Sequence, residues 1–132
     1  MTTRPRVLLA DDHAGIVQVL DRLLSRDCDI VGVVADGRDV ADAATRLQPV
    51  VTVVDLNMPN VNGLDICRQI RGSDPDARVI VISGMFDDDI RDEALAAGAS
   101  GFFQKSAAGN ELIGAIERAW TRIIGPPSVP LS

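Results

Sequence analysis

The sequence is poor in aromatic residues and short of positive charge. It has no tyrosine and a single tryptophan, and aromatic residues make up 3% of its 132 positions, which is too few for a surface that stacks on bases. Nineteen acidic residues outnumber 13 lysines and arginines, giving a formal net charge of -6 that repels phosphate backbones. We therefore expect no nucleic-acid binding by this chain alone.

The chain also has few cysteines and no long hydrophobic run. Cys28 and Cys67 lie far apart and lack the spacing of metal ligands, so we expect two reduced thiols, as in the cytosol, and no disulfide. No stretch approaches the roughly 18 apolar residues of a membrane span. Residues 1–6 do not resemble a signal peptide. These features predict a cytoplasmic protein that does not associate with a membrane.

What the sequence does contain is an alternation of short apolar runs and amphipathic stretches. The runs predict strands at residues 6–10, 30–35, 50–54, 79–82 and 101–104, and the stretches predict helices at residues 13–26, 40–47, 63–71, 90–97 and 110–124. This alternation indicates one α/β domain over residues 1–124, with an open parallel sheet covered by helices on both faces. Residues 125–132, rich in proline, are interpreted as a tail or the start of an interdomain linker.

Four of the predicted strands end on polar residues, namely Asp11 and Asp12, Asp55, Ser83 and Lys105. In a parallel sheet these ends share one edge, where carboxylates about 5 Å apart repel by about 3 kcal/mol per pair at an effective dielectric of about 20. Mg²⁺, which prefers oxygen ligands, would relieve that repulsion. A metal beside a carboxylate, a hydroxyl and an ammonium group is typical of phosphoryl transfer. The glycine-rich phosphate cradle of a nucleotide site is absent from the first turn.

The strand ends also resemble a known family, the receiver domains of two-component response regulators. The resemblance rests on V-L-L-A-D-D-H, V-V-D-L-N-M-P-N-V-N-G-L-D, V-I-V-I-S-G and G-A-S-G-F-F-Q-K-S, in the family's order and spacing, and covers about residues 6–124. The D-D-H and Lys-Ser pairs are familiar in receivers of LuxR/NarL-type helix-turn-helix regulators. The resemblance implies a doubly wound, flavodoxin-like sheet of five parallel strands in the order 2-1-3-4-5.

The resemblance also implies roles for individual residues. Asp55 is expected to accept a phosphoryl group from a sensor histidine kinase. Asp12 and Asp55 would bind Mg²⁺, with the backbone carbonyl of Asn57 as a third protein ligand and Asp11 acting largely through water. No other cofactor is implied.

The remaining roles concern the response to phosphorylation. Ser83 would hydrogen-bond a phosphoryl oxygen, Lys105 would pair with the phosphate, and Ser83 with Phe102 would switch the domain between inactive and active conformations. The active form is expected to control a DNA-binding output domain that is not in this chain, and to form a homodimer. We do not expect the chain to be an enzyme, although it would catalyse its own phosphorylation and dephosphorylation.

Two other functions compete with this interpretation. A phosphatase of the haloacid dehalogenase type also forms an aspartyl phosphate, but it carries a second Asp two residues after the nucleophile, where this chain has Asn57. The other competing function is that of a constitutive dimerisation unit, which would use the receiver fold without phosphorylation.

Each residue also has a purely structural alternative. Asp11 and Asp12 would cap a helix, Ser83 would be a turn residue, Lys105 a solvated charge, and Phe102 core packing. His13 is interpreted as a surface residue at the start of a helix, neither a ligand nor a phosphodonor, because the kinase supplies the reactive histidine.

Overall fold

The computed structural model describes residues 4–124, which form an α/β sandwich around a five-stranded parallel sheet. The strand order is β2-β1-β3-β4-β5, as the family resemblance implied, with every pair parallel. The strands are β1 (Arg6–Ala10), β2 (Asp29–Val34), β3 (Val51–Asp55), β4 (Arg78–Ser83) and β5 (Gly101–Gln104). The helices are α1 (Ala14–Leu24), α2 (Val40–Leu47), α3 (Gly63–Ser73), α4 (Asp88–Ala96) and α5 (Ala108–Ile124).

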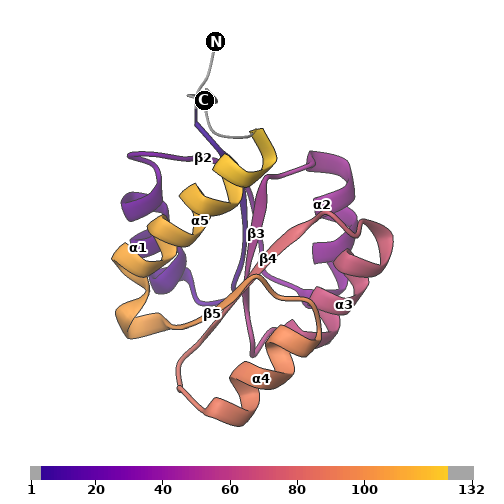
Figure 1. Ribbon diagram of the computed structural model, residues 1–132. Coiled ribbons are helices and arrows are strands. Elements are labelled where there is room, and N and C mark those ends of the chain that lie inside the picture. Colours follow the sequence, from indigo (N-terminus) through magenta and orange to yellow (C-terminus); the bar gives the residue numbers. More distant parts are fainter. Residues whose placement is uncertain (1–3, 125–132) are drawn as a thin grey trace, which may run out of the picture.

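Helices cover both faces of the sheet (Figure 1). On one face α1 and α5 bury Leu20, Leu24, Leu112 and Ile116 against alternate residues of β1, β3 and β4. On the other face α2, α3 and α4 cover the opposite set of strand side chains in a second buried cluster. Because both faces are covered, β3 is buried along its whole length, as its β-branched composition predicts.

The boundaries of several elements differ from the sequence predictions. Helix α1 begins at Ala14, with His13 as its N-cap, and it ends at Leu24 rather than at residue 26. Helix α4 begins earlier than predicted because the Asp87 carboxylate accepts hydrogen bonds from the N–H groups of Asp89 and Ile90. Helix α2 ends where Gln48 adopts the left-handed conformation, one residue before Pro49.

Strand β3 includes Asp55 instead of ending before it, and β2 begins at Asp29 and ends at Val34. Two single turns of 3-10 helix were not predicted: Gly37–Asp39 precedes α2 and Lys105–Ala107 precedes α5. The proline-rich residues 125–132, interpreted above as a tail or linker, lie outside the described residues.

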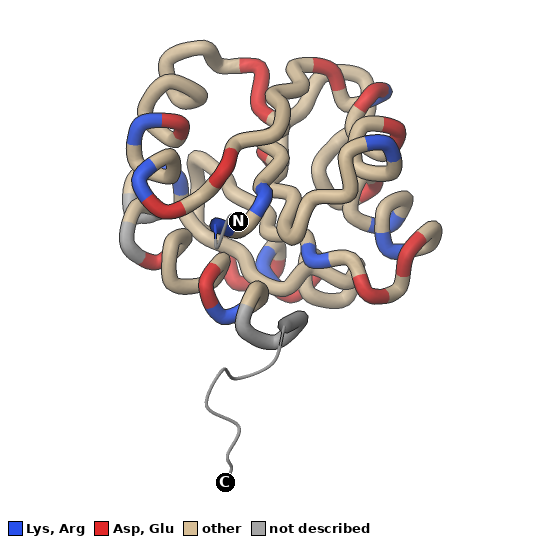
Figure 2. The backbone as a smooth tube through the Cα atoms, turned by 90° about the horizontal axis from the view of Figure 1, so that it is seen from above, with Lys and Arg blue, Asp and Glu red and all other residues tan. Residues whose placement is uncertain are grey.

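Acidic and basic residues are interspersed over the helices and loops (Figure 2). Most ion pairs join neighbours in sequence, such as Arg68 with Asp65 and Arg91 with Asp88. Exposed pairs of this kind contribute little to stability. Within residues 4–124, no helix has both the length and the apolar character needed to span a membrane.

Candidate functional site

The carboxyl edge of the sheet collects buried charged groups. Asp55, the last residue of β3, is 1% exposed, and Asp11, which follows β1, is 2% exposed. Strands β1 and β3 are hydrogen-bonded neighbours in register Ala10 to Val54, so the two acids follow side by side. Two carboxylates this deeply buried require a counter-charge.

Lys105 supplies that charge from the end of β5. Its Nζ lies 3.0 Å from Oδ2 of Asp55, to which it donates a hydrogen bond, and 3.1 Å from Oδ2 of Asp11. Burial of the ammonium disfavours its charge, but pairing with Asp55 and Asp11 outweighs that effect and raises the pKa of Lys105. Lys105 is therefore a largely buried ion-pair partner, with its side chain 13% exposed, and not the solvated charge of the structural alternative.

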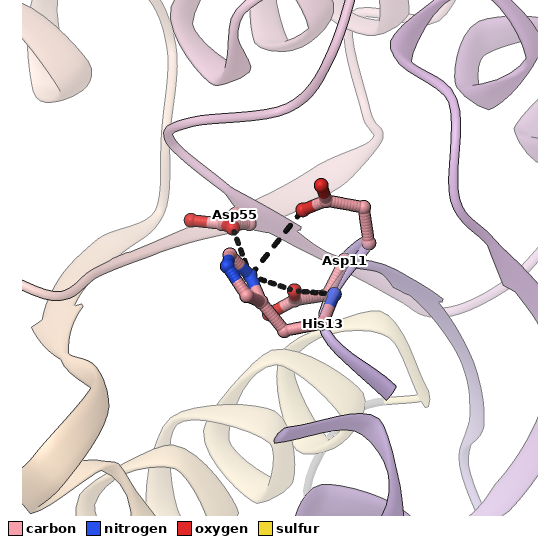
Figure 3. Close-up of side chains that lie close together, drawn as sticks. Asp11, His13 and Asp55 are labelled. Atoms are coloured by element: carbon pink, nitrogen blue, oxygen red, sulfur yellow. Dashed lines mark hydrogen bonds and ion pairs between the residues drawn. The ribbon is translucent and has the colours of Figure 1, made fainter. Parts of the chain in front are cut away.

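His13 is an exposed residue at the start of α1, as predicted, and its ring lies beside the same carboxylates. Its Nδ1 is 3.1 Å from Oδ1 of Asp11, 3.3 Å from Oδ1 of Asp12 and 3.7 Å from Oδ2 of Asp55 (Figure 3). The backbone N–H of His13 also donates to Oδ1 of Asp11, at 2.9 Å. Sequence spacing places His13 at the start of a helix but carries no signal for the direction of its ring.

The donor atoms at this edge fit a hard divalent cation. One ligand atom from each of Asp11, Asp12, His13 and Asp55 lies within 4.8 Å of the others. Oδ2 of Asp11 is buried without a hydrogen-bond partner, although the Lys105 ammonium is near it. A group of carboxylate oxygens this close together matches the oxygen-rich coordination of Mg²⁺.

Asn57 lies in the loop directly beyond Asp55. Its backbone N–H donates to Oδ1 of Asp55 at 3.2 Å, which leaves Oδ2 facing Lys105 and His13. The short turn from Asp55 to Asn57 keeps the backbone of Asn57 beside the acidic group, and the role of its carbonyl as a metal ligand stays a prediction.

Ser83 and Phe102 occupy the neighbouring strands β4 and β5. Ser83 is 2% exposed and lies one residue beyond Ile82, which pairs in register with Asp55. Its Oγ accepts the N–H of Met85 at 3.2 Å. Phe102 is 6% exposed, and its ring centroid is 6.1 Å from that of Phe86 in the loop before α4. The Phe102 side chain is thus buried in the protein, and it packs against Phe86, whose side chain is half exposed.

A contact between two loops at this edge was not predicted from the sequence. The N–H of Gly37 donates to the carbonyl of Pro59 at 2.9 Å, and Nδ2 of Asn60 donates to Oδ2 of Asp36 at 2.9 Å. A Cβ atom on Gly37 would lie 2.3 Å from the carbonyl oxygen of Val61, so only glycine fits. The sequence signalled Asp36-Gly37 as a turn leaving β2 but carried no sign of its partner loop. We call this contact the loop clasp.

Comparison with known proteins identifies relatives of the whole domain. Residues 7–117 match the model of the response regulator receiver domain. The chain is 34% identical over 115 residues, 85% of its length, to the DNA-binding transcriptional activator DevR/DosR of Mycobacterium tuberculosis. It is 30% identical over 114 residues, 86% of its length, to the chemotaxis protein CheY of Thermotoga maritima.

Solved structures agree with this grouping. The signal receiver domain of the putative response regulator NarL from Mycobacterium tuberculosis aligns with a TM-score of 0.85 at 27% identity, covering 91% of this chain and 98% of that one. A LuxR-family response regulator from Aurantimonas sp. SI85-9A1 has the same TM-score at 30% identity, over 91% of this chain and 87% of that one. The chain spans 52% of DevR/DosR but 95% of CheY.

Proposed function

The chain belongs to the family of response regulator receiver domains. From that membership we propose that Asp55 is its phosphoacceptor and that a sensor histidine kinase phosphorylates it in a reaction that requires Mg²⁺. Receiver domains are signalling domains of two-component systems rather than classical enzymes, and they bind Mg²⁺ at an acidic site. The observation that carries the proposal is the burial of Asp55 beside Asp11, with Lys105 bonded to one oxygen.

The chemistry follows from these contacts. A carboxylate oxygen of Asp55 attacks the phosphorus of a phosphohistidine, a P–O bond forms as the P–N bond breaks, and the imidazole leaves. Asp12, Asp55 and the carbonyl of Asn57 would hold the Mg²⁺, with Asp11 acting largely through water. When bound, this cation offsets charge on the transferring phosphoryl oxygens. The same machinery supports transfer from small phosphodonors and later hydrolysis, the only catalysis we propose for the chain.

Lys105 and Ser83 then respond to the new charge. A phosphoryl group adds nearly two negative charges and acceptor oxygens at the end of β3. The Lys105 ammonium already contacts Oδ2 of Asp55 and needs little movement to pair with the phosphate. The Ser83 hydroxyl, which accepts the Met85 N–H, has its proton available to donate to a phosphoryl oxygen.

Phe102 pairs in register with Val81, two residues before Ser83 on β4, so Ser83 and Phe102 lie on the same face of the sheet and movement of Ser83 would change the space near Phe102. We propose that Ser83 and Phe102 are the switch residues of a two-state domain. A shift from 1:99 to 99:1 requires about 5.5 kcal/mol of differential interaction, which charge-assisted hydrogen bonds to Ser83 and Lys105 can supply.

The output is proposed to be transcriptional. DevR/DosR is named a DNA-binding transcriptional activator, and the chain matches about half of its length. We propose that residues 125–132 begin a linker to a DNA-binding domain, that phosphorylation promotes homodimerisation, and that the protein acts in the cytoplasm, where its kinase partner transfers phosphate. A net charge of -6 argues against DNA contact by this chain itself.

Labelling with acetyl phosphate tests the phosphoacceptor. Wild-type protein with Mg²⁺ is expected to gain an alkali-labile, hydroxylamine-sensitive phosphoryl group, and Asp55→Asn is expected to gain none. Asp42→Asn, a change at an exposed acid of α2, is the matched control and should label like wild type. Retention of label by Asp55→Asn would contradict the proposal, and steady hydrolysis of small phosphoesters would favour the phosphatase alternative.

A further inference from the structure

The loop clasp holds the tip of the β3–α3 loop, residues 56–62, from outside the site. The contact between Asn60 and Asp36 joins residues 24 positions apart in sequence, and Gly37 adds a backbone hydrogen bond to Pro59. The backbone of Asn60 has a φ of 71°, in the left-handed region that asparagine and aspartate adopt more readily than most residues. The clasp therefore fixes the loop at its sharpest turn.

The same loop reaches back to the proposed phosphoacceptor. The backbone N–H of Asn57 donates to Oδ1 of Asp55 at 3.2 Å. A single residue, Met58, separates Asn57 from Pro59, and its side chain is buried in the core cluster under α2 and α3. A short segment with a buried side chain in its middle transmits a displacement at one end to the other. The position of the Asn57 N–H therefore depends on the clasp.

Both oxygens of Asp55 are oriented by the protein, Oδ1 by Asn57 and Oδ2 by Lys105. A nucleophile that is held in one orientation reacts faster than one that rotates. We propose that Asp36 and Asn60 are positioning residues for the phosphorylation of Asp55. Their contact holds the loop so that the N–H of Asn57 stays on Oδ1 and the carboxylate keeps its orientation. The inference rests on the proposed function for the role of Asp55, and it gives the loop clasp a part in the reaction that acts through Asn57.

The pair can be broken and rebuilt by exchanging its two members. Asn60→Asp puts a carboxylate where the amide now donates to Asp36, so the two side chains repel, while aspartate still tolerates the left-handed backbone. The double variant Asp36→Asn/Asn60→Asp restores one donor and one acceptor with their places exchanged. Asparagine at position 36 also remains a good cap for the 3-10 turn Gly37–Asp39. The exchange therefore separates the contact from the identity of either residue.

The experiment measures two rates in conditions where urea titrations show every variant to be folded: phosphorylation by acetyl phosphate with Mg²⁺, and hydrogen exchange of the Asn57 amide. We expect Asn60→Asp to be phosphorylated about three- to tenfold more slowly and its Asn57 amide to exchange at least about threefold faster. The double variant should recover most of both losses. Arg38→Gln removes the exposed ion pair of Asp36 but keeps its contact with Asn60, and it should match wild type within about twofold.

A general loss of stability would speed exchange elsewhere as well, so the amide of Ile66, which donates to the Asn62 carbonyl at the start of α3, should keep its wild-type rate. The inference is overturned if Asn60→Asp reacts or exchanges like wild type, if the double variant is as impaired as the single one, or if Ile66 changes as much as Asn57. A wild-type protein that takes no label would count against the proposed function, whereas a labelled wild type with unaffected variants counts only against the positioning role.

Discussion

Two loops flank the proposed phosphoacceptor, and they are built in opposite ways. The β3–α3 loop is tied at both ends and in its middle: Gly63 N–H bonds to the Leu56 carbonyl, and the loop clasp holds Pro59 and Asn60. The hydrogen bonds of the β4–α4 loop in the described chain are local, to Ser83 and within the start of α4. Its Met85 and Phe86 side chains are 67% and 51% exposed.

This difference separates the fixed half of the site from the half that can respond. The proposed metal ligands and the proposed acceptor need constant positions, and they lie at the ends of β1 and β3 and in the clasped loop. Ser83 and Phe102 need two positions, and they adjoin the loosely held loop. A local change of charge moves most easily the segment with the fewest hydrogen bonds to the rest of the protein. We therefore expect the β4–α4 loop to change conformation on phosphorylation.

The largest expected effect comes from adding a methyl group inside the loop clasp. In Gly37→Ala the new Cβ would lie within 2.9 Å of three backbone atoms of Pro59 and Val61, which cannot rotate away. We expect a loss of about 2–3 kcal/mol in the free energy of unfolding, measured with urea.

Gly84→Ala in the other loop is the matched control, since nothing lies within 4 Å of its Cβ position. It should change stability by no more than about 1 kcal/mol. Equal losses in the two variants would remove the distinction between the loops.

Mg²⁺ should stabilise the fixed half. Mg²⁺ at about thirty times its dissociation constant is expected to raise the free energy of unfolding by about 2 kcal/mol, because the folded site binds it and the unfolded chain does not. Urea titrations with MgCl₂ and with NaCl at matched ionic strength measure this gain. Asp12→Asn should show a smaller gain, and a wild-type protein that gains nothing would contradict a metal site at this edge.

Replacing the exposed aromatic of the responsive loop should cost less. Phe86 contacts the Phe102 ring and lies 5.9 Å from the guanidinium of Arg91. Phe86→Ala is expected to lose about 1 kcal/mol of stability yet to reduce the response of Phe102 to beryllofluoride and Mg²⁺. Val19→Ala, at an equally exposed apolar position on α1, is the control for lost apolar surface. A response of Phe102 as large as in wild type would show that Phe86 plays no part in the switch.

The smallest effect concerns the acid of the loop clasp. The Arg38 side chain, then its backbone N–H, and also the Asn60 amide, hold the pKa of Asp36 below its usual range. A lowered carboxyl pKa contributes stability above the unfolded pKa of about 4, and this contribution is lost as pH falls below that value.

The stability difference between wild type and Asp36→Asn should therefore shrink when urea titrations are moved from about pH 7 to about pH 3. Asp42→Asn provides the reference for an exposed acid. A difference that grows toward acid pH would contradict the lowered pKa of Asp36.

Much of the fold and the site could be predicted from the sequence because strands that are buried on both faces leave a clear signal. The apolar runs ending at Asp11, Asp55, Ser83 and Lys105 located the strands to within about one or two residues, and parallel pairing placed those ends on one edge. The strand order came from the family resemblance and is confirmed.

Features set by contacts between distant segments left no comparable signal. The sequence marks Asp36-Gly37 and Pro59 to Gly63 as turns, but it does not say that one turn packs on the other. The direction of the His13 ring was not predicted for a related reason: helical spacing fixes where a residue lies along the chain, whereas the carboxylates beside its ring lie at the ends of β1 and β3. The roles of Ser83 and Phe102 stay predictions.

Amide spectra recorded with and without beryllofluoride and Mg²⁺ test the contrast between the two loops most directly. Beyond residues touching the phosphoryl mimic, we expect the largest changes at Met85, Phe86 and Phe102, while Asn60 and Gly63 change little. Changes concentrated in the clasped loop, with Met85, Phe86 and Phe102 unmoved, would contradict this contrast.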